Sequence, residues 1–488
     1  MQQFNKFLLM NALAMPAKKD SAVVSAMKFL NDEILSKILI VALLGAGIWF
    51  SLRLGFVQVK DFKKGWRRTF GGLFGKKTDA GKDGMSSFQA LATAIAAQVG
   101  TGNIAGAATA IATGGPGAIF WMWLAAFLGM ATIYGEALMA QKYKKVDDDG
   151  TVTGGPVYYI LAAFKYSKFG KFMAGLFAVL ITFALGFMGN AVQSNSIAAA
   201  CNVAFGVNMK VMGVIIAILA FLVFSGGVKR IAKFTETVVP IMAAFYIIGS
   251  LIVIIGNAGA IPGVFKSIFV GAFTPQAIFG GTFGYTVKKA LQMGIARGLF
   301  SNEAGMGSTP HAHAVAKVDH PVEQGQVAMV GVFMDTFIIL NLTAFVILTT
   351  GALQPDGKGG STLTGAALTQ AGFDAYYGHA GVTFIAICMF FFAFSTIIGW
   401  YFFGEANIRY LFGEKAIKPY SIIVCICVFL GTFAEVPVVW SMADLFNSMM
   451  VVPNIIGLLL LSNVIVEVHR DYKKKVAKGE LKEPGGEK

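Results

Sequence analysis

A short polar stretch with two glycines interrupts one of the apolar runs of this sequence. Residues 98–103 read Gln-Val-Gly-Thr-Gly-Asn and lie inside the apolar run 88–113. Glycine is unfavourable in a helix interior, where it costs about 1 kcal/mol relative to alanine. In a membrane, backbone groups released from a helix are tolerated only where they face protein or water. The stretch therefore predicts an unwound helix beside an internal binding site.

Such an unwound segment offers both kinds of backbone group to a ligand. It exposes carbonyl oxygens near Val99 and Gly100. It also exposes amides near Thr101 and Gly102, and Thr101 and Asn103 add side-chain hydrogen bonds. Half-helix N-termini attract a carboxylate and half-helix C-termini attract a cation, as an amino acid and a sodium ion require. Alternatively, the small residues only let neighbouring helices approach closely.

A second glycine-rich interruption follows about 180 residues later. Residues 279–284 read Phe-Gly-Gly-Thr-Phe-Gly and again lie inside an apolar segment. Paired interruptions at corresponding positions of two halves are typical of the binding site of a secondary transporter. We therefore predict a carrier whose site lies between the two interruptions.

One apolar run carries amides and a hydroxyl on a single helix face. Asn190, Gln193 and Ser194 occur at i, i+3 and i+4, which places them on the same side of a helix. Such groups either bond a neighbouring helix or reach a ligand. Gln193 is the better ligand candidate, because its side chain is longer.

Two adjacent hydroxyls in a later apolar run suit a small cation. Ser395 and Thr396 supply oxygen ligands of the kind that hard cations prefer. Trp400 lies one turn beyond Thr396, where it forms an apolar wall beside the ion. The alternative is that both hydroxyls bond back to carbonyls of their own helix.

Asp335 is the most isolated charge of the sequence, since apolar residues flank it on both sides. An acid within a membrane span is a candidate proton carrier. We favour instead a structural pair with Lys288 or Lys289. His311 and His313 have no convincing partners for zinc, and we expect them in a solvated loop.

Composition places these residues in a membrane. Of the 488 residues, 56% are hydrophobic and 14% are charged, whereas soluble domains are about a quarter charged. The net charge of +14 lies in short loops between apolar runs, where it sets orientation and does not indicate nucleic acid. The four cysteines form no disulfide framework. We predict an all-α polytopic membrane protein.

The loops predict a topology of about eleven transmembrane helices. The first span, residues 38–56, precedes a basic loop, which places the N-terminus outside and the C-terminus in the cytoplasm. Without this span, the two interruptions fall in the first and sixth of ten helices, as in a 5+5 inverted repeat. The predicted parts are an N-terminal interfacial segment (1–35), a transmembrane domain (36–468) with repeats at about 87–256 and 264–467, and a cytoplasmic tail (469–488).

Several runs of this sequence resemble the alanine or glycine:cation symporter family, also called sodium:alanine symporters. The most specific is 114–124, Gly-Gly-Pro-Gly-Ala-Ile-Phe-Trp-Met-Trp-Leu, which contains two tryptophans. Further family-like runs are 154–156, 298–307 and 399–401. The resemblance extends from about residue 40 to residue 468.

The resemblance implies a fold similar to the broken-helix, inverted-repeat (LeuT-like) sodium symporters, with one extra N-terminal span before the ten-helix core. It implies small neutral amino acids as substrates, chiefly alanine and glycine, often with both enantiomers of alanine. The positions that it implies around the substrate are Thr101, Gly102, Asn103, Gln193, Phe279, Gly280, Gly281 and Trp400. The positions that it implies at the sodium site are Val99, Gly102, Ser395 and Thr396.

Together these features predict a symporter of the cell (inner) membrane that couples inward sodium movement to amino-acid uptake by alternating access. Its expected partners are alanine or glycine, sodium as the coupling ion, and the lipid bilayer, with no other cofactor. An enzyme is not expected, because no nucleophile, base and orienting group occur together. The alternatives are a proton-coupled or glutamine carrier that uses Asp335, and an ion channel or membrane receptor.

Overall fold

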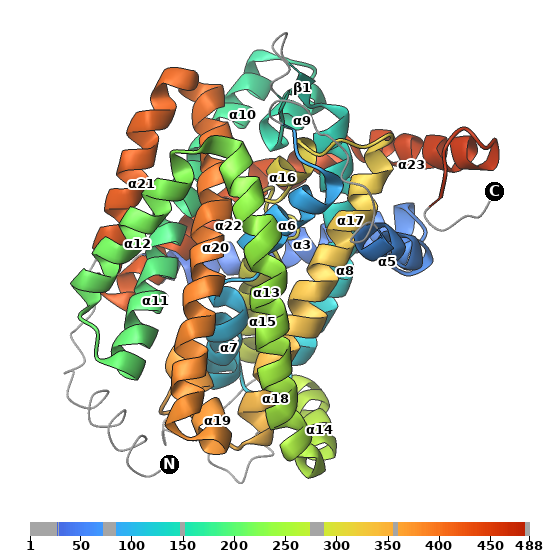
Figure 1. The fold of residues 1–488 in the computed structure, drawn as a ribbon. Helices are drawn as coiled ribbons and strands as arrows, with labels where there is room; N and C mark the ends of the chain where they lie inside the picture. The colour runs from blue at the N-terminus through green and yellow to red at the C-terminus, as the bar shows by residue number, and fades with distance from the viewer. Residues whose placement is uncertain are drawn as a thin grey trace.

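A computed structural model describes residues 27, 29–71, 84–146, 152–273, 287–354 and 360–483. Within these ranges the chain is a bundle of helices with one small two-stranded sheet (Figure 1). Seven helices in the described part are long and apolar enough to cross a membrane. The all-α polytopic class predicted from the sequence is confirmed.

The seven long spans include twelve helical elements. They are α3 (Ser36–Arg53) with the turn η1 (Leu30–Leu35) before it; α8 (Gly117–Lys142); α10 (Lys168–Ile181), η3 (Thr182–Gly189) and α11 (Asn190–Phe205); α13 (Gly227–Gly256); α17 (Pro321–Phe333), η5 (Met334–Leu340) and α18 (Asn341–Thr349); α20 (His379–Phe412); and α22 (Val436–Leu460).

Shorter helices occupy the other four predicted span positions, so the order of about eleven spans matches the order of these helices. They are α6 (Ser87–Gln98) with η2 (Gly102–Gly106) and α7 (Ala107–Gly114), α12 (Met209–Phe224), α15 (Val287–Asn302) and α21 (Ile417–Gly431). The connecting elements are α4 (Val57–Lys60), α5 (Phe62–Gly71), β1 (Lys145–Val146), β2 (Val152–Thr153), α9 (Pro156–Ala163), η4 (Ala258–Ala260), α14 (Ile261–Phe273), α16 (Pro310–Ala314), α19 (Gly365–Tyr377), η6 (Glu414–Ala416) and α23 (Ser462–Ala477).

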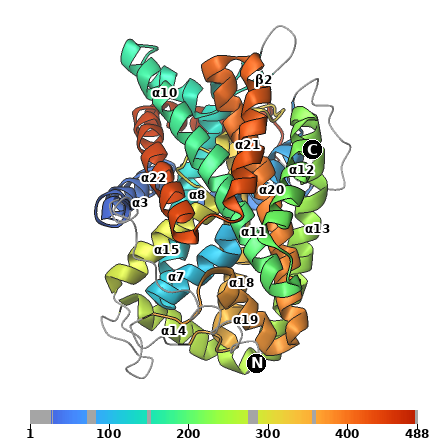
Figure 2. The same ribbon diagram turned by 90° about the vertical axis from the view of Figure 1, so that its left-hand side faces the viewer.

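The bundle has two distinct ends in both views (Figures 1 and 2). The helices α14 and α19 lie at one end, which we call the α19 end. The helix α9, the sheet β1–β2 and the start of α10 lie at the other end, which we call the α9 end. Strand β1 and the first turn of α13 carry basic residues there, Lys145 and Lys229. Both lysines belong to loops that the topology prediction assigns to the cytoplasm.

The helix α6 begins and ends for local reasons. At its start Ser86 and Gln89 form a capping box, in which each side chain accepts a hydrogen bond from the backbone N–H of the other. At its end Val99 has φ −83° and ψ 85°, which takes the chain out of the helix. The chain becomes helical again as the π-helical turn η2. Turns of this kind frequently mark functional sites, and two more, η3 and η5, lie within long spans.

Both predicted terminal segments pack onto the bundle where they are described. Within the predicted interfacial segment, Asn31 of η1 is buried and donates to the carbonyl of Ser441 on α22. Within the predicted tail, α23 buries Tyr472, whose hydroxyl accepts a hydrogen bond from Arg68 of α5 at 3.1 Å. The contacts of these residues join each segment to the helical core.

Candidate functional site

The predicted break at residues 98–103 is confirmed, and side chains satisfy the amides that it releases. The Gly100 N–H donates to the Asn103 amide oxygen at 3.0 Å. The Thr101 N–H donates to the amide oxygen of Gln193 on α11 at 3.1 Å. Gln193 therefore bonds a neighbouring helix at the break, and its role as a substrate ligand stays a prediction.

Two glycines of the break allow three other helices to converge on it. A Cβ added to Gly100 would lie 2.3 Å from the hydroxyl oxygen of Thr396 on α20. A Cβ added to Gly102 would lie 2.9 Å from the Cα of Ser301 on α15. The glycines thus serve close approach as well as unwinding, and the binding site beside the break stays a prediction.

The hydroxyls of Ser395 and Thr396 meet the carbonyl end of α6. The Thr396 hydroxyl donates to the carbonyl of Ala96 at 2.9 Å, and that of Ser395 lies 3.4 Å from the same oxygen. Both also bond back to the carbonyl of Phe392 in their own helix. Hydroxyl oxygens beside the C-terminal end of a half-helix are the surroundings in which broken-helix carriers hold sodium. Val99 follows directly after this helix end.

Trp400 is buried beside the non-helical segment that separates α15 from α16. Its indole N–H donates to Glu303 at 2.5 Å, and its ring meets that of Phe300 edge-on at 5.7 Å. Glu303 has φ 58°, in the left-handed region, and begins the non-helical residues 303–309 between α15 and α16. The last residue of α15 before this segment contacts the first break, because the Gln98 amide donates to the carbonyl of Asn302 at 2.8 Å.

A buried carboxylate on α8 clamps the segment 303–309. Glu136 accepts hydrogen bonds from the N–H groups of Gly305 at 2.9 Å and Gly307 at 3.0 Å, and from the amide of Asn454 at 2.6 Å. Both glycines have left-handed φ values, 88° and 80°, which favour glycine. Sequence reasoning placed no site residue here, although the family-like run 298–307 contains these two glycines.

The predicted second break at 279–284 lies outside the described residues. Phe279, Gly280 and Gly281 therefore remain predictions.

The carboxylate of Asp335 connects the first break to α15 through hydrogen bonds with neutral side chains. Its carboxylate accepts hydrogen bonds from the amide of Asn103 at 2.6 Å, from the hydroxyl of Ser301 at 3.0 Å and from that of Thr336 at 2.9 Å. The expected pair with Lys288 or Lys289 is wrong. Lys289 lies twelve residues before Ser301 on α15, which is about 18 Å along a helix axis.

His311 and His313 are buried, so their expected place in a solvated loop is wrong. His311 contacts the Ser308 carbonyl and the Asn407 amide, and His313 contacts the Gln324 side chain. Burial lowers the pKa of both imidazoles to about 4, which keeps them neutral. No group of three or more metal-ligating side chains occurs in the described ranges.

The chain is similar to known sodium-coupled transporters over almost all of its length. A sequence profile of the sodium:alanine symporter family matches residues 20–485. The sodium/alanine symporter AgcS of Methanococcus maripaludis is 43% identical over 94% of this chain and 99% of its own length. The probable sodium/glutamine symporter GlnT of Bacillus subtilis is 43% identical over 92% of this chain and 90% of its own.

Among solved structures, that of a sodium-coupled sialic acid symporter matches with a TM-score of 0.49 and 14% identity, over 90% of this chain and 84% of that one. The family profile and the relatives describe transporters of the cell membrane, not enzymes. The match of the profile to residues 20–485, together with 43% identity to AgcS, shows that this multi-pass membrane protein belongs to the sodium:alanine symporter family.

Proposed function

We propose that this chain is a secondary symporter that couples inward sodium movement to the uptake of a small neutral amino acid, alanine or glycine. The observation that carries the proposal is the convergence on one helix break of Gln193, Thr396 and Ser301, which come from three different spans. The membership of the family and the name of the relative AgcS support sodium and alanine as the transported pair.

The two ligands have separate places at the break. Sodium would bind at the carbonyl end of α6, with Val99, Gly102, Ser395 and Thr396 as candidate ligands. The amino-acid carboxylate would bind at the amides of Thr101 and Gly102, in place of the Gln193 oxygen that Thr101 now contacts. Because both ligands use the same break, each favours the conformation that binds the other, which is the thermodynamic basis of coupling.

Close packing around the break supports a small substrate. Trp400 and Phe300 stand beside it, and Trp400 also lies against Gly189, where an added Cβ would be 2.6 Å from the indole. Asn103 is held by Asp335 and supplies its amide oxygen to Gly100. Large side chains on the substrate would have to displace these groups.

The orientation in the membrane follows from the basic loops. We assign the α9 end to the cytoplasm, because basic residues gather in cytoplasmic loops of membrane proteins. An odd number of spans then places the N-terminus outside and the C-terminus in the cytoplasm.

The test is uptake of labelled amino acid into proteoliposomes of the purified protein. We expect an imposed sodium gradient, and not a proton gradient, to drive accumulation of alanine and glycine that saturates with concentration. Glutamine is tested in parallel, because the relative GlnT is named for it. Accumulation of glutamine alone would contradict the proposed substrate, and unsaturable flux would indicate a pore.

Asp335 motivates the second candidate, a proton-coupled carrier, because it is a buried carboxylate next to the break. In that case Asp335→Asn would abolish accumulation driven by a proton gradient and leave exchange of internal for external alanine largely intact. Sodium-driven accumulation that is unaltered in the variant would exclude a proton-carrying role for this residue.

A further inference from the structure

A cavity of about 360 Å³ lies next to the candidate site on the side of the α19 end. Ala105 and Thr109 of the broken helix, Asn195 and Ser196 of α11, and Arg297 of α15 line it, together with the start of α19. This volume is within the range of about 300–1,000 Å³ typical of small-molecule sites. The lining offers hydroxyl and amide groups and one guanidinium.

Each of the three main lining helices also carries a residue of the candidate site. Ala105 is two residues after Asn103, and Asn195 is two residues after Gln193. Arg297 lies one helical turn before Ser301, the residue that contacts Gly102. A solute in the cavity would therefore contact the same helices that carry the candidate site residues.

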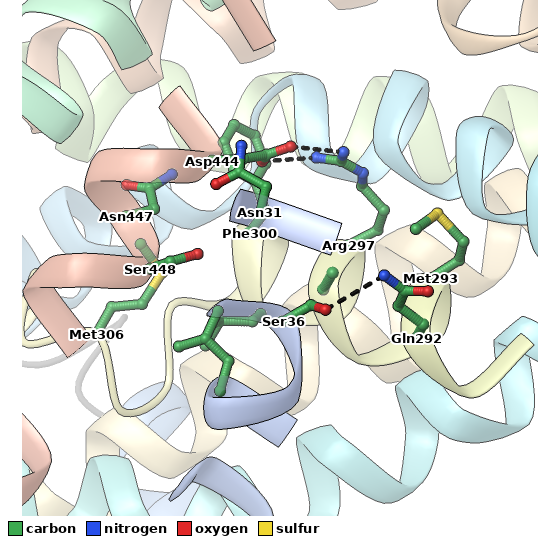
Figure 3. Close-up of a pocket in the computed structure, with 13 residues that line it drawn as sticks. Asn31, Ser36, Gln292, Met293, Arg297, Phe300, Met306, Asp444, Asn447 and Ser448 are labelled. Atoms are coloured by element: carbon green, nitrogen blue, oxygen red, sulfur yellow. Dashed lines mark hydrogen bonds and ion pairs between the residues drawn. The ribbon is translucent and has the colours of Figure 1, made fainter. Parts of the chain in front are cut away.

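Arg297 is held in this cavity by an ion pair with Asp444 of α22. Two parallel hydrogen bonds join the guanidinium to the carboxylate at 3.0 and 2.8 Å, as Figure 3 shows in a view of a neighbouring pocket that both residues also line. The Arg297 side chain is 12% exposed and that of Asp444 28%. The guanidinium also lies 4.9 Å from the ring of Trp440, which lines the cavity.

The ligand that fits this arrangement carries a carboxylate. A guanidinium binds carboxylates through two parallel hydrogen bonds, so a second carboxylate can take the place of the first with the same geometry. Asp444 is the more exposed partner and is the one that water can solvate after release. The ring of Phe300 contacts both Trp440 and Trp400, at 5.1 and 5.7 Å, so this helix connects the cavity to the site.

We propose that Arg297 binds the carboxylate of the incoming amino acid in this cavity, in exchange for Asp444, before the substrate reaches the broken helix. The exchange keeps the charge of Arg297 compensated, and water solvates the released Asp444, which is the more exposed partner. When the amino acid moves on, the pair between Arg297 and Asp444 forms again behind it. The inference rests on the proposed function, since it takes an amino acid as the ligand.

The test is the KM for alanine in sodium-driven proteoliposome uptake, measured for two variants with opposite expectations. Arg297→Gln removes the carboxylate partner, so we expect the KM to rise at least tenfold. Asp444→Asn removes the competing carboxylate, so we expect the KM to fall at least threefold. The matched control is Arg409→Gln, because Arg409 is also partly buried and paired, with Glu405 at 3.0 Å, but lies at the α9 end. Its KM should match that of the original protein.

A pair that only fastens α15 to α22 predicts a different result. Both variants would then change the KM in the same direction, and that outcome, or no change in either variant, overturns the proposal. If Arg297→Gln does not purify as a monodisperse protein, Arg297→Lys replaces it, with a smaller rise in KM because lysine keeps only the charge. Failure of the unsubstituted protein to accumulate alanine would instead contradict the proposed function.

Discussion

At Gly100 the space that a side chain would need is already occupied. An added methyl group would lie 2.3 Å from the Thr396 hydroxyl oxygen and 3.1 Å from the Gln193 amide oxygen. Forcing extra atoms into a packed interior costs about 1–3 kcal/mol, and about 1.4 kcal/mol is a factor of ten in a population. We therefore expect Gly100→Ala to lower sodium-driven alanine uptake at least about tenfold, measured in proteoliposomes.

The control for this variant is Gly45→Ala in α3. No atom lies within 4 Å of a Cβ added to Gly45, and alanine is the better residue in a helix interior by about 0.5–1 kcal/mol. Uptake by this variant should stay unchanged. Equal losses in the two variants would show that the break is no more sensitive to an added methyl group than α3 is. That result would contradict the role given to Gly100.

The hydroxyl of Thr396 on α20 forms a hydrogen bond with α6. We expect the affinity for sodium to fall when this hydroxyl is removed. We expect Thr396→Ala to raise the sodium concentration for half-maximal uptake at least about tenfold. The variant loses the proposed oxygen ligand and a hydrogen bond to Ala96, and the bond alone is worth about 0.5–1.5 kcal/mol. The measurement is alanine uptake against sodium concentration. Thr350→Ala is the control, because the described bonds of its hydroxyl stay within its own helix, to Val346 and Ile347.

Among the elements, the segment 303–309 is held in position by the side chain of Glu136. Glu136→Gln replaces an oxygen that accepts from the N–H of Gly305 or Gly307 by an NH₂ group, which cannot accept. Loss of one hydrogen bond to a charged group costs about 1.5–3 kcal/mol. We expect amide hydrogen exchange across 303–309 to become at least about tenfold faster in the variant, measured by mass spectrometry.

Glu467→Gln provides the comparison for this experiment, because Glu467 is an exposed carboxylate on α23. Exchange in the segment should not respond to it. If exchange is the same in the Glu136 variant and in the original protein, the carboxylate does not hold the segment.

How far these elements can be predicted from sequence depends on where their contacts come from. The break after Gln98 is visible because its glycines stand alone in an apolar run. The segment after Asn302 is not, because Asn302, Glu303 and the histidines look like an ordinary hydrophilic loop. Its contacts with the bundle come from residues far away in the sequence, among them Glu136, Trp400 and Asn454. No local sequence pattern predicts contacts over such separations. The same limit explains the wrong lysine partner for Asp335.

At the scale of the whole molecule, the two ends differ in a way that suits alternating access. On the side of the α19 end, the cavity of about 360 Å³ leads to the broken helix through Arg297. On the side of the α9 end, the segment 303–309 is fastened to α8 and α20 by Glu136 and Trp400. A substrate can thus approach the break from the α19 end while the segment closes the α9 end.

This arrangement makes the orientation of the chain a testable property of the whole molecule. Inward transport from the cavity requires the α19 end to face outside, with the basic α9 end in the cytoplasm, as the positive-inside rule also requires. Single cysteines are placed in a variant without the four native ones, Cys201, Cys388, Cys425 and Cys427. Lys210→Cys at the start of α12 reports on the α19 end, and Lys478→Cys beyond α23 reports on the tail; both positions are exposed.

We expect a membrane-impermeant thiol reagent to label Lys210→Cys in intact cells and Lys478→Cys only after the membrane is permeabilised. Labelling is compared with that of the cysteine-free protein, and sodium-driven alanine uptake by each variant confirms that it is folded. The reverse labelling pattern would show that the α19 end, and with it the cavity, faces the cytoplasm. The segment 303–309 would then close the outer side, and the path through Arg297 would be the route by which the amino acid leaves the site.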